Sequence, residues 1–133
     1  STIQPCKPSA TSHGRILVVD DERLVLELQK TMLTTLGFDV DAFSDPAAAL
    51  MFYRRESQEI NLVIMDMIMP TMGGQDLFLA MRAINPDVKV IISSGYSLDD
   101  GVGSLIALGA KSILQKPFRK AELEQHVRDA MRQ

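Results

Sequence analysis

Three aspartates stand directly after apolar runs of the sequence. Asp20 and Asp21 follow the run at 16–19, and Asp66 follows the run at 62–65. Carboxylates gathered in one place repel one another unless a cation lies among them. A hard divalent ion such as Mg²⁺ binds a few carboxylate oxygens together with water and phosphate. A carboxylate in such a site can attack phosphorus and form an acyl phosphate, so these residues predict metal-dependent phosphoryl chemistry.

A hydroxyl and an amine occupy comparable positions later in the chain. Ser94 follows the apolar run at 88–92, and Lys116 follows the run at 112–114. Each has an ordinary alternative, because a serine often sits in a turn and a lysine is usually solvated. Asp20 or Asp21 could likewise cap the helix that follows. Asp66 is harder to explain in this way, since a carboxylate between apolar residues is costly unless it is paired or metal-bound.

The apolar runs alternate with helical patterns, which predicts five strand–helix units. The runs lie at 16–19, 38–43, 62–65, 88–92 and 112–114. Several are apolar at consecutive positions, as in strands of a parallel sheet that is covered on both faces. The predicted fold is α/β, with a doubly wound five-stranded parallel sheet flanked by five helices. The loops that follow the strands meet at one edge of such a sheet, which would bring the five polar side chains together.

Local signals mark the expected first two helices. Leu24, Leu28 and Met32 recur at four-residue spacing and predict the buried stripe of the first, and Gly37 lies where its C-terminal cap would fall. The dipeptide 45–46, Asp-Pro, predicts the N-cap and first turn of the second helix.

Three further helices are expected. The third contains Leu77 and Met81 and should stop at the Asn-Pro pair 85–86. The fourth is expected at 98–108, and the fifth should bury Leu123 and its neighbours one helical turn apart.

Composition narrows the class of protein. A length of 133 residues fits one domain, with residues 1–14 as a polar tail or linker and the domain at 15–133. A net charge of -3 gives no reason to expect direct nucleic-acid binding. The single cysteine, Cys6, allows no internal disulfide and favours a reducing compartment. No apolar run approaches the roughly 20 residues of a membrane span. A cytoplasmic domain without membrane contact is therefore expected, and a membrane-anchored parent is compatible with this.

Four motifs occur in one order along the chain. They are VVDDE at 18–22, DMIMPTMGG at 66–74, SSGY at 93–96 and KPF at 116–118. Their order and approximate spacing resemble the response-regulator receiver family of two-component signalling, over residues 15–132. The resemblance implies the flavodoxin-like strand order 2-1-3-4-5. It also implies a phosphoacceptor domain that receives its phosphoryl group from a histidine kinase or a histidine phosphotransfer protein and then changes conformation.

The same resemblance implies a metal site. Asp66 would accept the phosphoryl group, and Mg²⁺ (or Mn²⁺) would be held by Asp20, Asp21, Asp66 and the backbone carbonyl of Ile68. Asp21 would be the more direct ligand of the two neighbouring aspartates. The domain would thereby catalyse its own phosphorylation and dephosphorylation.

The resemblance assigns the remaining polar side chains to phosphoryl binding. Ser94 would be the switch hydroxyl, Lys116 would bind a second phosphoryl oxygen, and the bond between Lys116 and Pro117 is expected to be cis. Ile113 stands where many relatives have an aromatic switch, so a loop and the fourth helix would have to carry the signal. The fourth helix, fifth strand and fifth helix are the expected partner surface, through which a weak dimer could also form.

Other functions fit the sequence less well. An aspartyl phosphatase of the haloacid-dehalogenase type needs a second aspartate two residues after the nucleophile, where this chain has Ile68. A flavodoxin-like cofactor site needs a first loop rich in Ser, Thr and Gly, where this chain has acidic residues at 20–22. A degenerate receiver that acts only as an interaction module would not need all five site residues. The polar tail and the SSGY motif favour a receiver from a hybrid sensor histidine kinase over a stand-alone regulator.

Overall fold

Five parallel strands form the central layer of the molecule, which the computed structural model describes over residues 14–95 and 106–132. The strands are β1 (Arg15–Val19), β2 (Asp39–Phe43), β3 (Leu62–Asp66), β4 (Val90–Ser94) and β5 (Ser112–Gln115). Their order in the sheet is β2-β1-β3-β4-β5, and each neighbouring pair is parallel. The predicted fold class and strand order are therefore confirmed.

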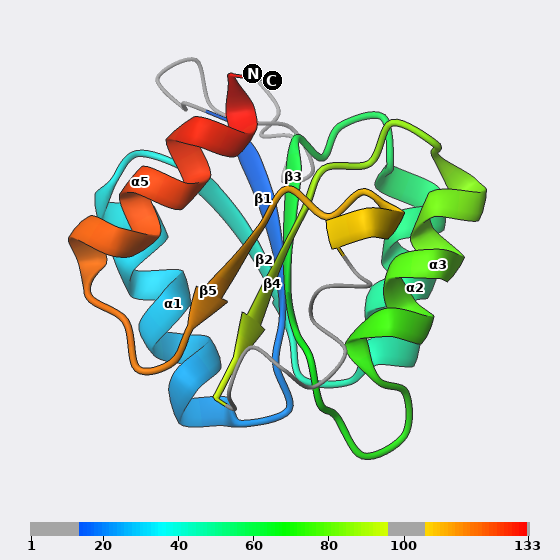
Figure 1. Cartoon of the computed structure of the whole chain (residues 1–133), viewed down its shortest axis with the longest axis horizontal. Coiled ribbons are helices and arrows are strands. Elements are labelled where there is room, and N and C mark those ends of the chain that lie inside the picture. The colour runs from blue at the N-terminus through cyan, green and yellow to red at the C-terminus, as the bar shows by residue number, and fades with distance from the viewer. Residues whose placement is uncertain (1–13, 96–105, 133) are drawn as a thin grey trace, which may run out of the picture.

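Helices cover both faces of the sheet (Figure 1). They are α1 (Arg23–Thr35), α2 (Pro46–Glu56), α3 (Gly74–Ile84) and α5 (Lys120–Met131). Helices α1 and α5 lie on one face, and α2 and α3 lie on the other. Residues 106–108 are also helical, whereas the rest of the fourth helix predicted at 98–108 lies outside the described residues. Among the described helices, none has the length and apolar character to cross a membrane.

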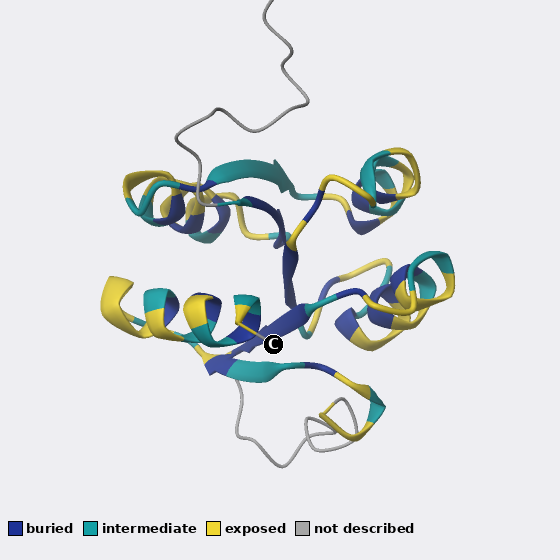
Figure 2. Ribbon diagram, turned by 90° about the horizontal axis from the view of Figure 1, so that it is seen from above, coloured by how far each residue is buried: buried dark blue, intermediate teal, exposed yellow. Residues whose placement is uncertain are grey.

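The sheet is buried on both faces because its side chains alternate between two apolar clusters. Along β1, Leu17 and Val19 belong to the cluster beneath α2 and α3, whereas Ile16 and Val18 belong to the cluster beneath α1 and α5. Every residue of β1, β3 and β4 is buried, and Figure 2 shows this dark band between the two helical layers. The consecutive apolar runs of the sequence thus follow from packing on both faces. This double layer of packing holds the strand ends in place.

Three predicted helix boundaries are confirmed. Asp45 is the N-cap of α2, and its side chain accepts a hydrogen bond from the backbone N–H of Ala47 at 3.1 Å. Pro46 occupies the first helical position. Gly37 follows α1 with φ of +98°, a left-handed conformation that favours glycine. Helix α3 ends before Asn85, where the following proline prevents its continuation.

The predicted buried stripe of α1 is wrong for two of its three residues, because only Met32 packs against the cluster beneath α1 and α5. Leu24 is 87% exposed and Leu28 is 54% exposed, whereas the side chains that face the sheet are those of Leu26, Gln29 and Leu33. Both sets recur at helical spacing, so periodicity alone could not decide which of them packs against the sheet. The choice follows from where α1 starts, because the chain must leave β1 and turn at 20–22 before the helix begins.

Strand β4 lies two residues later than the predicted run at 88–92. It pairs with β3 from Val90, opposite Val63, to Ser93, opposite Asp66. The sheet therefore includes two serines, since Ser94 pairs with Gln115 of β5. Backbone pairing satisfies their peptide groups whatever side chains they carry. As a result, the Ser93 and Ser94 side chains are buried at the end of the strand.

Candidate functional site

The predicted polar residues meet at the carboxyl ends of the strands, the lower edge of the sheet in Figure 1. Asp20 directly follows β1, Asp66 is the last residue of β3, and Ser94 is the last residue of β4. Lys116 directly follows β5, and its backbone N–H donates to the Ser94 carbonyl at 2.7 Å. The Lys116–Pro117 peptide bond is cis, as predicted. Parallel pairing thus brings together residues that lie up to 96 positions apart.

Asp20 is completely buried and accepts three hydrogen bonds. The backbone N–H of Glu22 donates to its Oδ1 at 3.0 Å. Lys116 Nζ donates to its Oδ2 at 2.7 Å, and Gln29 Nε2 donates to the same oxygen at 3.3 Å. These donors offset the cost of burying the carboxylate.

Asp66 shares this lysine but is less well satisfied. Its carboxylate lies 3.4 Å from Lys116 Nζ, and its side chain is nearly as buried as that of Asp20. Burial raises the pKa of Asp66 to about 6, the charge of Lys116 opposes this rise, and the charges of Asp20 and Asp21 add to it. Ionised Asp66 is therefore held in an unfavourable environment, which an additional cation would relieve.

The pKa of Lys116 is raised as well, which in a lysine favours the charged form. Burial alone would lower the pKa of Lys116, but the hydrogen bond to Asp20 and the charge of Asp66 raise it above its ordinary value. The lysine is thus held in its charged form. One ammonium group therefore forms ion pairs with two buried carboxylates.

The three aspartates form a donor set suited to a metal ion. One carboxylate oxygen from each of Asp20, Asp21 and Asp66 lies within 4.8 Å of the others. Such oxygen ligands are the kind that hard divalent cations prefer. The ionised cluster carries three negative charges against the single positive charge of Lys116, so a divalent cation would balance it.

A hollow of about 450 Å³ opens over these side chains. Asp21, Asp66, Ile68 and Lys116 are among the residues that line it. The Ile68 side chain is 53% exposed at its mouth, whereas Ser94 is 2% exposed and is not among the lining residues. The structure thus gives a small ligand direct access to Asp66.

Asp20 and Asp21 do not cap helix α1, although helix capping was the ordinary alternative for acidic residues at these positions. Helix α1 begins at Arg23, its N-cap is Glu22, and no side chain makes the capping hydrogen bond. The Asp20 carboxylate points instead to the backbone of Glu22 and to Lys116. The acidic pair belongs to the carboxylate cluster rather than to the helix end.

Two contacts at the site escaped the sequence analysis. Gln29 contacts Asp20, and its position between Leu26 and Leu33 at helical spacing was the available signal. Gly74, the first residue of α3, packs so closely on β3 that an added Cβ would lie 2.5 Å from the carbonyl oxygen of Asp66. Nothing in the local sequence distinguishes Gly74 from a turn glycine.

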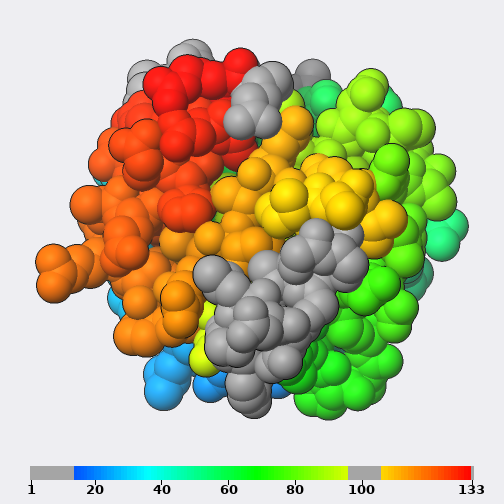
Figure 3. All heavy atoms as spheres, viewed as in Figure 1, coloured from blue at the N-terminus to red at the C-terminus, as the bar shows by residue number. Residues whose placement is uncertain are grey.

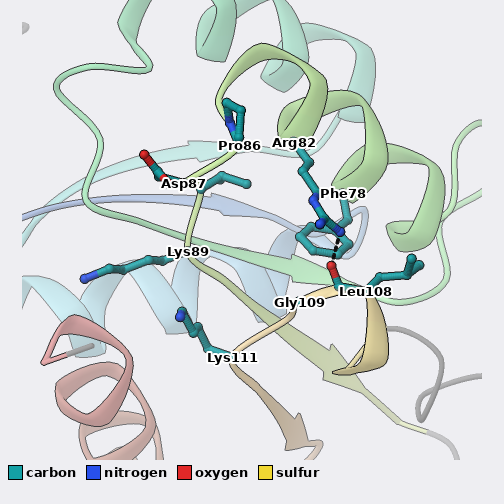
Figure 4. A pocket seen from close by; sticks show the side chains of 9 residues that line it. Phe78, Arg82, Pro86, Asp87, Lys89, Leu108, Gly109 and Lys111 are labelled. Carbon is teal, nitrogen blue, oxygen red and sulfur yellow. Dashed lines mark hydrogen bonds between the residues drawn. The ribbon is translucent and has the colours of Figure 1, made fainter.

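A second hollow, of about 380 Å³, lies at the opposite edge of the sheet (Figure 4). It has three basic lining residues, of which two are bound to helix ends. Arg82 donates to the Leu108 carbonyl, and Lys89 Nζ donates to the Met131 carbonyl at 3.2 Å. These two cations satisfy carbonyls that a helix leaves without partners, so Arg82 and Lys89 have structural roles in this hollow.

The chain has relatives in sequence and in structure. Residues 16–128 match the family model of the response regulator receiver domain. The transcriptional regulatory protein PrrA of Mycobacterium leprae is 37% identical over 93% of this chain and 52% of its own length. A probable transcriptional regulator ycf27 of Porphyridium aerugineum is 34% identical over 89% of this chain and 48% of its own length. The chain thus spans about half the length of these curated relatives.

Solved receiver structures superpose closely on this fold. A response regulator receiver domain protein of Clostridium thermocellum has a TM-score of 0.86 at 30% identity and covers 90% of this chain and 94% of its own. The response regulator TrrA of Thermotoga maritima, solved in complex with Mg²⁺–BeF, has a TM-score of 0.76 at 31% identity and covers 88% of this chain and 98% of its own. Together with the match over residues 16–128, these likenesses establish that the chain belongs to the response regulator receiver domain family of two-component systems.

Proposed function

We propose that this domain accepts a phosphoryl group on Asp66 in a Mg²⁺-dependent reaction and relays the signal through a change of conformation. The observation that carries the proposal is that Asp66 lines an open hollow, among two further carboxylates and Lys116. The donor is a histidine kinase or a histidine phosphotransfer protein. The Mg²⁺ complex of the related TrrA protein supports the choice of metal.

The residues of the site have separate roles in the proposed reaction. An oxygen of Asp66 attacks the phosphorus of a phosphohistidine, a new P–O bond forms, and the P–N bond breaks with its electron pair left on the imidazole. Asp20, Asp21, Asp66 and the Ile68 carbonyl would hold the metal ion, which neutralises charge on the transferred group. With a pKa of about 6, Asp66 is mostly ionised at neutral pH and available as the nucleophile.

Lys116 and Ser94 would bind the new phosphoryl group. Lys116 Nζ already lies between the two buried carboxylates, 2.7 Å from Asp20 and 3.4 Å from Asp66. A phosphoryl group on Asp66 would add negative charge beside that ammonium and draw it away from Asp20. Ser94 stands at the end of the strand next to β3, where a small shift would bring its hydroxyl toward the same group.

Phosphate uptake tests the proposal directly. The chain is incubated with acetyl phosphate and Mg²⁺, and the modified residue is located by mass spectrometry. Asp66→Asn should abolish uptake, whereas Asp76→Asn, an exposed aspartate in the first turn of α3, should leave it unchanged. Stoichiometric labelling of Asp66→Asn, or labelling of the wild type in excess chelator, would overturn the assignment.

The exposed face of α1 supports a protein as the phosphodonor. Leu24 and Leu28 are exposed, and Leu28 borders a hollow of about 410 Å³ that also contacts Lys116 and Phe118. This largely apolar surface adjoins the site, so a donor docked on it could present its histidine to Asp66. Apolar patches of this kind are typical of protein contacts.

A double variant separates docking from chemistry. Leu24→Ser with Leu28→Ser should slow transfer from a phosphorylated histidine phosphotransfer protein about tenfold, the effect of losing about 1.4 kcal/mol of binding. Phosphorylation by acetyl phosphate should not change. Met51→Ser, at an exposed apolar position on α2, is the control. Equal slowing with both donors would place the defect in the site and not in docking.

The output surface is proposed to include β5 and α5 together with the fourth helix. Ser112 Oγ and His126 Nδ1 are hydrogen-bonded at 2.8 Å, which joins β5 to α5. Figure 3 shows the surface of β5 continuing onto α5 on one side and onto residues 106–109 on the other. A weak dimer would use the same face. Amide NMR with and without beryllofluoride tests this: unchanged signals throughout residues 106–131 would exclude the face as the output.

A further inference from the structure

Gln29 is a buried polar residue on the sheet-facing side of α1. It is 1% exposed and lies between Leu26 and Leu33, which pack into the apolar cluster beneath α1 and α5. A polar group in such a place lowers stability unless its hydrogen bonds are satisfied. The presence of an amide at this position therefore calls for an explanation other than packing.

The amide is satisfied at one end only. Gln29 Nε2 donates to Asp20 Oδ2 at 3.3 Å. Gln29 Oε1 is buried and has no hydrogen-bond partner among the described residues. Methionine would fill a similar volume without leaving an acceptor unpaired. What glutamine provides and methionine would not is the N–H donor to Asp20.

That donor differs from the other side-chain donor to the same oxygen. Lys116 lies 2.7 Å from Asp20 and 3.4 Å from Asp66, so it is divided between two carboxylates. Gln29 is uncharged and lies in the core, and its Nε2 donates to Asp20. Any movement of Lys116 toward Asp66 leaves the amide as the side-chain donor that still holds Asp20.

We propose that Gln29 is a positioning residue that orients the Asp20 carboxylate for metal binding and keeps it oriented when Lys116 turns to the phosphoryl group. This inference rests on the proposed function, because it assigns Asp20 to the metal. Hydrogen bonds to the carboxylates that hold a metal fix their orientation, and losing one typically lowers metal affinity by about 10-fold or more. Gln29 Oε1 thus stays unpaired in the core, whereas Gln29 Nε2 fixes the orientation of the Asp20 carboxylate.

The test compares metal affinity with thermal stability in Gln29→Met. Mg²⁺ binding to the full chain is measured by calorimetric titration, and melting is measured without metal. The variant should bind Mg²⁺ about tenfold more weakly, whereas its melting temperature should be unchanged or raised. Gln125→Met is the matched control, because Gln125 Nε2 also donates to a carboxylate, Asp129 at 2.9 Å, but on the exposed surface of α5. The control should leave Mg²⁺ affinity unchanged.

Each outcome decides between the alternatives. A lowered melting temperature with unchanged Mg²⁺ affinity would overturn the positioning role and leave Gln29 a packing residue. If Gln29→Met fails to fold, Gln29→Leu is measured in the same way, and failure of both overturns the proposal. If the wild type binds neither Mg²⁺ nor beryllofluoride, the proposed function fails, and the inference fails with it. If the wild type binds Mg²⁺ and Gln29→Met binds it with equal affinity, only the inference about Gln29 is rejected, and the proposed function stands.

Discussion

A cation lies between carboxylates at each edge of the sheet, and the two clusters differ in how well their charges are balanced. At the amino ends of the strands, Arg15 is 3% exposed and binds Asp41 at 2.7 Å and Glu56 at 3.2 Å. Both acids are partly exposed, so water helps to stabilise them. At the carboxyl ends, Lys116 faces two acids that are almost fully buried, with Asp21 as a third nearby.

The difference shows how similar groups produce a structural anchor or a reactive site. Burial opposes the charge of Arg15, but its two acidic partners raise the pKa of the guanidinium overall. The Arg15 group also lies 5.4 Å from the centre of the Phe52 ring. At the other edge, burial dominates for Asp66 and raises its pKa to about 6. One edge is therefore electrostatically satisfied, and the other is left able to bind a further cation.

The largest expected effect is a loss of stability when the Arg15 cation is removed. Arg15→Met should lower the free energy of unfolding by about 3 kcal/mol, because it leaves two acids at the edge of the core without their cation. Urea denaturation gives the value. The control is Arg128→Met, because Arg128 pairs with Glu124 on the surface of α5 at 49% exposure and should cost at most about 0.5 kcal/mol. Similar losses in both variants would mean that Arg15 does not anchor this edge.

Steric packing at the carboxyl ends of the strands should have the next largest effect. Gly74→Ala places a Cβ 2.5 Å from the Asp66 carbonyl oxygen, so α3 must shift away from β3. We expect a loss of about 2 kcal/mol in unfolding free energy and slower phosphorylation of Asp66. Gly73→Ala is the matched control, since its nearest neighbour would be an ordinary 3.6 Å away. Equal stability of the two alanine variants would contradict this account.

The unfavourable charge of Asp66 should appear in the pH dependence of stability without metal. Its folded pKa of about 6 exceeds the ordinary value of 3.8 for an aspartate, so the folded state binds more protons between these values and stability falls as pH rises through them. Asp66→Asn removes this charge. The variant should gain about 1–2 kcal/mol over the wild type at pH 7.5 and nothing near pH 3.5. The gain is measured from denaturation curves of both proteins at the two pH values. A gain of the same size at both pH values would contradict the prediction.

Added Mg²⁺ should produce the smallest effect and should act on one edge only. At a concentration tenfold above its dissociation constant, Mg²⁺ should raise the unfolding free energy by about 1.4 kcal/mol. Asp21→Ala should remove most of this gain, whereas Arg15→Met should retain it because that cluster lies at the other edge. Thermal melting with and without Mg²⁺ measures both. A metal-induced gain that survives in Asp21→Ala would place the binding elsewhere.

Much of the fold and of the candidate site could be predicted from local sequence patterns. The alternation of apolar runs with helical stretches predicted the parallel sheet, and the Asp-Pro pair at 45–46 predicted the start of α2. Asp20, Asp66 and Lys116 were identified because polar residues at the ends of parallel strands meet at one edge. Each inference depends on neighbouring residues or on a general rule of sheet topology.

Other features were decided by the tertiary structure. Leu24 and Leu28 form as regular a stripe as Leu26 and Leu33, and packing against the sheet selected the second pair. Strand β4 extends into its serines because β3 supplies the backbone partner of Ser93 and β5 that of Ser94.

The sequence by itself determined which residues could do phosphoryl chemistry and on which kind of fold, because those signals are local or follow from strand topology. Only the tertiary structure decided how the charges are shared. The contact of Gln29 with Asp20, the division of Lys116 between two acids, and the pairing of Arg15 with Asp41 all join separate elements. Their strength depends on distance and burial, which no local pattern specifies.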